Sequence, residues 1–312
     1  MSFKYLNPGY AELLDVAGGT TVVDTVKSKT GVKFYQPTAK KGINLSAAPT
    51  DFYGKYDVYI GNDYNSFITR VALLKSGGYS YSGGIGFTKD SNAMYFYRYY
   101  NGNSTISSKA YTSDPKALNI QLDAINTVWF HVTSGSPGKL EIYSNGVLVD
   151  ALDVTINLSD SENTIDVYAS NSNGAISNLI LSDTEIDKKE QVAVLPIATT
   201  EATMTQGENG EYIAGTAGQT ILQTVDVASL INDYGADTDI KGIAVIGNPA
   251  YRTAEGLSDL TALQHDGTTL TEYGTKTAPA STSGMVMDAH ALSMKLPALA
   301  NYKFGWKAGV GS

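Results

Sequence analysis

The feature that most constrains the fold is a set of three strand-like segments, which span residues 128–132, 140–147 and 175–182. In the first two, large apolar residues alternate with residues that face the other way, which is the period of a β-strand. The second segment closes on Asn145-Gly146, a strong short signal for a two-residue hairpin turn. Together the segments predict late antiparallel strands of a jelly roll.

In order, these segments read WFHV (129–132), IYSNG (142–146) and ISNLILS (176–182). Their order and spacing resemble the concanavalin A-like (laminin G-like) family. The resemblance covers residues 1–187 and implies a jelly-roll sandwich. That fold serves lectins, hydrolases and inert spacers alike, so the resemblance speaks to fold more than to function.

The chain has 312 residues, which favours more than one domain. Its 31 glycines and 21 tyrosines suit an all-β protein, with glycine in turns and aromatic residues on pleated surfaces. Residues 183–191 cluster charges around one apolar residue and predict a solvated connector. We therefore expect a concanavalin A-like sandwich over residues 1–187, with further strands at 57–62, 67–75 and 118–122. A smaller, mostly β domain is expected over 188–312, with a short helix at 228–235.

Net charge is −9, so no basic field is expected to attract nucleic acid, and the absence of cysteine excludes disulfides and thiolate metal sites. No run is long and apolar enough for a membrane span or signal peptide, which predicts a protein made in the cytoplasm without a signal peptide. A phage virion component leaves the cell by lysis. The protein either works in the cytoplasm or leaves the cell in this way, in a virion. A sugar-binding sandwich without a secretion signal favours the virion, with other virion proteins or further copies of this chain as partners.

The segment MYFYRYY (94–100) is the main candidate for ligand binding. In a strand, Tyr95, Tyr97 and Tyr99 share one face, so one aromatic row is expected to lie outside the core. Tyrosine rings stack on pyranose faces, and arginine pairs with sugar hydroxyls or acids. The alternative, a tyrosine ladder that stabilises the sheet, stays open. The candidate carbohydrate-binding residues are Tyr79, Tyr81, Tyr95, Tyr97, Arg98 and Tyr99.

Two acidic patterns bear on catalysis and metal binding. Glu185, Asp187 and Glu190 match the Glu-x-Asp-x-x-Glu spacing of laminarinase-like hydrolases, but they follow the closing strand and enclose two lysines, which favours a linker. We expect no catalytic residues. Asp57 and Asp63 are candidate calcium ligands, with acidic turn residues as the alternative. No other cofactor is expected.

These observations predict a non-catalytic structural protein of the phage virion or tail-fibre type, with a lectin-like, carbohydrate-binding first domain. A glycoside hydrolase or lyase on the same sandwich remains one alternative, and a purely structural module without a ligand another. We expect His131 to be a strand histidine with satisfied hydrogen bonds and not a catalytic base.

Overall fold

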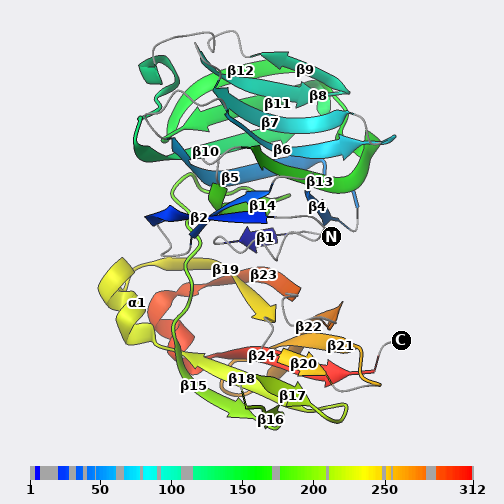
Figure 1. Ribbon diagram of the computed structural model, residues 1–312, viewed down its shortest axis with the longest axis vertical. Helices are drawn as coiled ribbons and strands as arrows, with labels where there is room; N and C mark the ends of the chain where they lie inside the picture. The colour runs from blue at the N-terminus through cyan, green and yellow to red at the C-terminus, as the bar shows by residue number, and fades with distance from the viewer. Residues whose placement is uncertain are drawn as a thin grey trace. The chain divides into compact units, whose positions relative to one another are not determined.

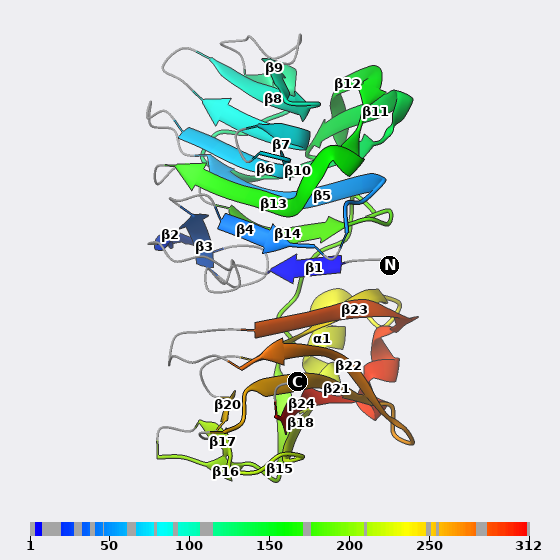
Figure 2. The same ribbon diagram turned by 90° about the vertical axis from the view of Figure 1, so that its right-hand side faces the viewer.

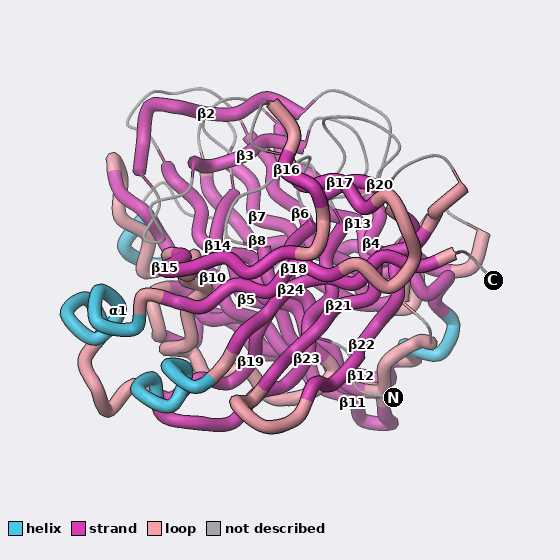
Figure 3. The backbone as a smooth tube through the Cα atoms, turned by 90° about the horizontal axis from the view of Figure 1, so that it is seen from below, coloured by secondary structure: helices cyan, strands magenta, loops and turns pink. Residues whose placement is uncertain are grey.

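The chain divides into two compact units, Met1–Val194 and Leu195–Ser312. Both are built from strands, with few short helices, as the tube in Figure 3 shows, which confirms the predicted all-β class. The structure is a computed structural model that describes residues 4–7, 20–27, 33–37, 41–45, 47–60, 67–77, 80–89, 93–106, 115–170, 176–208, 211–247, 251–253, 256–278 and 286–310.

The first unit contains an eight-stranded antiparallel sheet with the order β12-β11-β10-β5-β14-β3-β2, in which β1 also pairs with β14. The strands are β1 (Lys4–Asn7), β2 (Thr20–Lys27), β3 (Lys33–Pro37), β5 (Asp51–Ile60), β10 (Ala124–Thr133), β11 (Gly135–Ser144), β12 (Val147–Ile156) and β14 (Ile176–Ser182).

A six-stranded antiparallel sheet forms the second layer of this unit, with the order β4-β13-β6-β7-β8-β9. Figure 2 shows β6, β7 and β8 on one side of the unit and β11 and β12 on the other. The strands are β4 (Lys41–Asn44), β6 (Phe67–Lys75), β7 (Tyr81–Lys89), β8 (Met94–Tyr100), β9 (Asn103–Ile106) and β13 (Ser161–Ser170).

The core lies between these two sheets. Phe52 and Phe130 of the eight-stranded sheet are fully buried, as are Phe87 and Phe96 of the six-stranded sheet. Burial of such rings is the main favourable term in folding. The hydroxyl of Tyr56, on β5, lies 3.2 Å from Thr69 Oγ1 on β6, so a polar contact also joins the two layers.

The hairpin between β11 and β12 turns at the predicted dipeptide. Asn145 has φ 46° and Gly146 has φ 81°. Positive φ at both central residues defines the type I′ turn, whose twist matches that of the flanking strands. The asparagine-glycine signal is therefore confirmed.

Two predicted strands differ from the structure. Residues 118–122 form no strand, because Asn119 and Asp123 adopt positive φ (52° and 54°), while Leu118 ends the 3₁₀ helix η2 (Pro115–Leu118) with its side chain buried. Strand β5 begins at Asp51, before the expected start at Asp57. Its earlier residues belong to the sheet because they pair with the end of β10.

The predicted solvated connector is wrong in one respect, because it packs on the first unit. Ile186 is 1% exposed, and its carbonyl accepts a hydrogen bond from Trp129 Nε1 at 2.9 Å. The Val192 amide donates to Asn178 Oδ1 at 2.7 Å. Two buried apolar residues, Ile186 and Val192, and main-chain polar groups anchor this segment. We refer to residues 183–192 as the connector.

The second unit has a five-stranded sheet (β15-β18-β24-β21-β22), a three-stranded sheet (β16-β17-β20) and the pair β19-β23. Its strands are β15 (Ile197–Ala202), β16 (Thr205–Gln206), β17 (Tyr212–Ala214), β18 (Thr220–Val225), β19 (Asp239–Gly247), β20 (Tyr251–Thr253), β21 (Asp259–His265), β22 (Leu270–Thr277), β23 (Val286–Lys295) and β24 (Lys303–Gly309).

The predicted helix is present as α1 (Val227–Tyr234), drawn in yellow in Figure 1. Asp226 caps it by accepting a hydrogen bond from the Ser229 amide, and Gly235 follows it with φ 86°. The core of this unit includes Trp306, which is 1% exposed. Among the described residues, no helix combines the length and apolar composition of a membrane span.

Candidate functional site

The outer face of the six-stranded sheet carries a row of residues that crosses four strands. Tyr168 of β13 pairs with Arg70 of β6, Arg70 with Gly86 of β7, and Gly86 with Tyr97 of β8. The neighbouring positions of these strands supply the core, so this row faces away from it. The row thus places one arginine between two tyrosines on the outer face.

The next row on the same face consists of Asp166, Ala72, Gly84 and Tyr99. Small residues in the middle of the face leave room for larger neighbours to lie across it. A Cβ atom at Gly86 would be 3.0 Å from the Tyr99 hydroxyl oxygen. Glycine at this position therefore allows Tyr99 to lie over β7, toward the arginine row.

Arg70 is fixed in place by three neighbours. Its Nε donates to Asp166 Oδ2 at 2.7 Å, and the Tyr81 hydroxyl donates to the same oxygen at 2.8 Å. The guanidinium carbon lies 4.9 Å from the Tyr81 ring centroid and 4.8 Å from that of Tyr168. These contacts hold the side chain in one conformation, so that a ligand would bind with little further loss of side-chain entropy. We define the Arg70 cluster as Arg70, Tyr81, Tyr97, Tyr99, Asp166 and Tyr168.

Burial controls the ionisation of the phenols in this cluster. Burial and then the charge of Asp166 raise the pKa of Tyr81, and burial raises the pKa of Tyr99. Burial lowers the pKa of Arg70, but Asp166 and Tyr81 act in the opposite direction and the net pKa is raised. At neutral pH the cluster therefore offers neutral phenols and a charged guanidinium, which suits hydrogen bonding more than proton abstraction.

Four of the tyrosines proposed from the sequence lie on this face. The rings of Tyr95 and Tyr97 are 5.2 Å apart, those of Tyr97 and Tyr99 are 6.1 Å apart, and Tyr81 packs 4.7 Å from Tyr99. Tyr95 and Tyr99 are buried (8% and 6% exposed), whereas Tyr97 is half-buried. The row is thus a tyrosine ladder, and within it Tyr97 presents the most surface to a ligand.

Arg98 does not join the cluster, which corrects the prediction made for it. It lies on the inner face of β8, where its Nε is 3.5 Å from Asp150 Oδ2 of β12. The side chains of both residues are largely buried, with exposures of 11% and 4%. Strand alternation places Arg98 opposite to Tyr97, so the two cannot share a ligand. Tyr79, the other predicted member, lies outside the described residues.

Sequence reasoning missed Arg70, Asp166 and Tyr168. Arg70 lies within the strand predicted at 67–75, at a position whose outward direction follows from the apolar residues on either side. Residues 165–169 alternate apolar and polar as Ile-Asp-Val-Tyr-Ala, which is also a strand signal. What no local pattern could supply is the pairing of β13 with β6, which brings Asp166 and Tyr168 next to Arg70.

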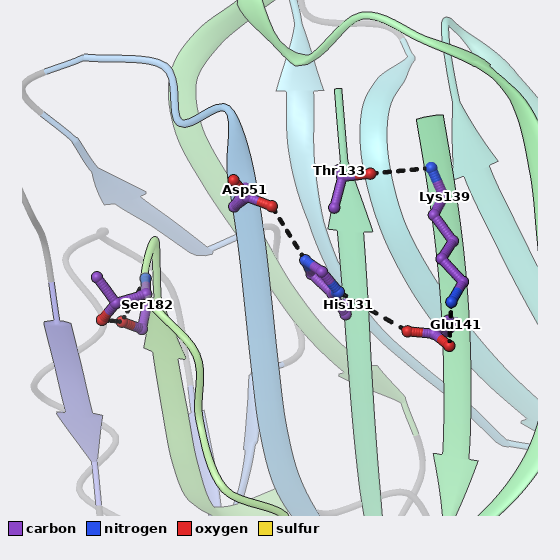
Figure 4. Close-up of polar contacts among 7 residues, drawn as sticks. Asp51, His131, Thr133, Lys139, Glu141 and Ser182 are labelled. Carbon is purple, nitrogen blue, oxygen red and sulfur yellow. Dashed lines mark hydrogen bonds and ion pairs between the residues drawn. The ribbon is translucent and has the colours of Figure 1, made fainter. Parts of the chain in front are cut away.

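The outer face of the eight-stranded sheet holds a second polar cluster, drawn in Figure 4. His131 Nε2 lies 3.1 Å from Asp51 Oδ1, and its Nδ1 lies 3.8 Å from Glu141 Oε2. The Tyr53 ring stacks on the imidazole at 3.9 Å. His131 is thus enclosed by its own sheet neighbours, on strands β5, β10 and β11.

The connector covers the adjacent part of this face. Lys188 Nζ lies 3.9 Å from the Tyr143 ring centroid and 5.0 Å from that of Trp129. Trp129 is only 6% exposed and donates its indole N–H to the connector. The connector therefore packs on Trp129 and Tyr143, two aromatic residues of this face.

The candidate metal and catalytic carboxylates take structural positions. Asp57 is fully buried and accepts hydrogen bonds from Thr127 Oγ1 (2.5 Å) and Asn178 Nδ2 (3.0 Å). Asp63 lies outside the described residues. Within the described part of the chain, no group of three or more histidines and carboxylates could hold a metal ion. The calcium site remains a prediction.

The Glu-x-Asp-x-x-Glu pattern lies in the connector and in no strand. Glu190 Oε1 accepts from the Asp187 amide at 3.1 Å, and Asp187 Oδ1 accepts from the Lys189 amide at 2.8 Å. Glu185 is exposed. These carboxylates stabilise a turn and do not project together from one strand face, as a glycosidase pair must.

No protein-family model matches the sequence, and no curated protein matches it. Solved structures similar to the chain include sheep galectin-11 in complex with glycerol (10% identity, TM-score 0.32, 46% of this chain and 97% of that one). They also include the carbohydrate-binding module CBM66 from Bacillus subtilis (13%, 0.30, 51% and 91%) and the alginate lyase Aly36B (16%, 0.36, 58% and 96%). Likenesses at this level leave the function undecided.

Proposed function

We propose that the first unit binds a carbohydrate on the outer face of its six-stranded sheet, through the Arg70 cluster. The observation that carries this proposal is a fixed, charged guanidinium surrounded by tyrosines from three strands. Phenol rings stack on the apolar faces of sugar rings, while phenol and guanidinium groups hydrogen-bond to hydroxyls. Because the arginine is already ordered, a ligand gains these contacts without ordering it.

The same geometry favours binding over catalysis. Hydrolysis of a glycosidic bond ordinarily uses two carboxyl groups on either side of it. Among the described strand residues on this face, Asp166 supplies the one carboxylate, and it is 1% exposed. A lyase needs a general base, and the raised pKa values of Tyr81 and Tyr99 make these phenols poor bases at neutral pH. We therefore propose a non-catalytic protein.

Affinity electrophoresis in gels that contain neutral polysaccharides such as laminarin, xylan or agarose tests this proposal. We expect retardation of the wild-type chain in at least one gel. Replacing Tyr97 by alanine removes a half-buried ring and should weaken that interaction by about 1–3 kcal/mol, or roughly 5- to 150-fold. The matched control is Tyr100→Ala, which removes a tyrosine from the inner face of the same strand.

Two outcomes would contradict the proposal. In the first, no polysaccharide retards the wild type, which favours a purely structural module. In the second, the chain releases reducing or unsaturated ends from a polysaccharide, which favours the hydrolase or lyase alternative. Membership of the concanavalin A-like family and a role in a phage virion or tail fibre stay predictions from the sequence.

A further inference from the structure

We infer that the Arg70 cluster selects neutral glycans over polyuronates, and that Asp166 determines this selectivity by neutralising Arg70. The inference rests on the proposed function and names its ligand class. It makes Asp166 a specificity-determining residue that acts through Arg70, without touching the ligand itself.

The charges on this face are few and balanced. Of the described strand residues that the pairings place on the outer face of the six-stranded sheet, only Arg70 and Asp166 are charged. Their nearest atoms are 2.7 Å apart. The described strand residues of this face therefore carry no net charge, and the whole chain has a net charge of −9. Long-range electrostatics thus repel a polyanion and leave a neutral chain unaffected.

The hydrogen-bond geometry acts in the same direction. A uronate carboxylate binds arginine best through two parallel N–H···O bonds. In this cluster Asp166 already takes the Nε–H of Arg70, and the rings of Tyr81 and Tyr168 lie against the guanidinium. A ligand carboxylate would have to share the guanidinium with a buried carboxylate of like charge. A sugar hydroxyl faces no such repulsion.

Among the described residues, Arg70 is the one cation within ion-pair distance of Asp166. Its Oδ2 accepts from Arg70 and Tyr81, and its Oδ1 is buried with no hydrogen-bond partner in the described part of the chain. Replacing the carboxylate by an amide preserves the shape and removes the charge. The Arg70 guanidinium would then be left uncompensated and open to an anionic ligand.

The experiment compares the full-length wild type with Asp166→Asn in two sets of affinity gels, one with neutral polysaccharides and one with alginate or polygalacturonate. We expect the wild type to be retarded only by a neutral polymer, and equally at low and high salt. We expect Asp166→Asn to gain roughly tenfold or more in polyuronate affinity. That gain should decrease at high salt, because salt screens the long-range attraction between Arg70 and a polyanion.

The matched control is Asp150→Asn, which removes the buried partner of Arg98 on the inner face and should leave selectivity unchanged. Thermal melts show whether each variant folds. If Asp166→Asn does not fold, the wild-type gels still test the inference. Stronger retardation of the wild type by a polyuronate than by any neutral polymer overturns it, as does a folded Asp166→Asn with unchanged selectivity. Retardation in no gel contradicts the proposed function itself.

Discussion

The two outer faces of the first unit carry similar side chains but differ in what packs on them. Each presents tyrosines beside a charged or titratable side chain, centred on Arg70 in one case and on His131 in the other. On the eight-stranded sheet, the connector packs on Trp129 and Tyr143. On the six-stranded sheet, the neighbours described for Arg70 lie on strands of that same sheet, and the Tyr97 ring stays half-buried.

This difference predicts which substitutions change folding stability and which change ligand binding. Aromatic and polar groups that the chain covers itself contribute to folding, because their removal leaves cavities or buried groups without partners. A half-buried group such as Tyr97 contributes less to folding and keeps surface that a ligand can contact. Substitutions at the connector-covered residues should therefore change stability, and substitution of Tyr97 should mainly change affinity.

The largest effect is expected at Trp129. Trp129→Ala removes a ring that is 6% exposed, together with its hydrogen bond to Ile186, and should lower the free energy of unfolding by about 3–5 kcal/mol. Trp129→Phe keeps most of the ring and loses the indole N–H, at a cost of about 1 kcal/mol. Urea denaturation measures both. Limited proteolysis should show faster cleavage in residues 183–192, and an unchanged cleavage rate would show that the tryptophan does not hold the connector.

The next largest effect is expected at Asn178, which joins the connector to the sheet. Its side chain donates to Asp57 and accepts from the Val192 amide, and its φ is 51°. Asn178→Ala should cost about 3 kcal/mol, because it removes one of the hydrogen bonds to the buried Asp57 carboxylate, leaves the Val192 amide without this acceptor, and strains the backbone. Asn178→Gly relieves the strain alone and serves as the control. Equal stability of wild type and Asn178→Ala would rule out this anchor.

A smaller effect concerns His290, a covered polar group of the second unit. Tyr273 stacks on it at 3.6 Å, Gln264 Oε1 lies 3.0 Å from its Nε2, and burial lowers its pKa below 6.5. The unfolded chain thus binds a proton more readily than the folded one. The stability that this histidine contributes is complete above pH 6.5 and is lost as the pH falls toward the lowered pKa.

Melting curves between about pH 8 and about pH 5 test this dependence, since that range brackets the ordinary histidine pKa. Tm of the second unit should fall more steeply with decreasing pH in the wild type than in His290→Gln. Parallel curves for the two proteins would show that His290 is not the titrating group.

The smallest effect is expected at the connector carboxylates. Glu185→Gln changes an exposed side chain, and Glu190→Gln changes one that accepts a hydrogen bond from the Asp187 amide. Neither should alter glycan binding, and each should change the free energy of unfolding by less than about 1 kcal/mol. Loss of a polysaccharide-degrading activity in either variant would reinstate the hydrolase alternative.

The sequence predicted those parts of the fold that depend on local chemistry. Asn145-Gly146 specifies a hairpin through its own backbone preferences, and the alternation at 67–75 and 94–100 reproduces β6 and β8. By contrast, the connector was expected to be solvated. Two buried apolar side chains, Ile186 and Val192, and a hydrogen bond from Trp129 to the Ile186 carbonyl anchor it, and its charged composition does not reveal these contacts.

The candidate site was predictable only in part, for the same reason. The tyrosines of β8 were found because alternation within one strand fixes which side chains share a face. The arginine beside these tyrosines was not predicted. Arg98 is their neighbour in sequence, whereas Arg70 is their neighbour in space. The pairing of β6 with β13, which supplies Asp166 and Tyr168, is a non-local property, and one sequence does not reveal it.

The most direct test locates the bound glycan on one of the two faces. In a chain with ¹³C-labelled tyrosine rings, a polysaccharide fragment that retards the protein in affinity gels is titrated while the ring resonances are recorded, each assigned by a tyrosine-to-phenylalanine variant. The account predicts shifts for Tyr81, Tyr97 and Tyr168, with Tyr53 and Tyr143 unchanged. Shifts confined to Tyr53 and Tyr143 would place the ligand on the connector-covered sheet and contradict it.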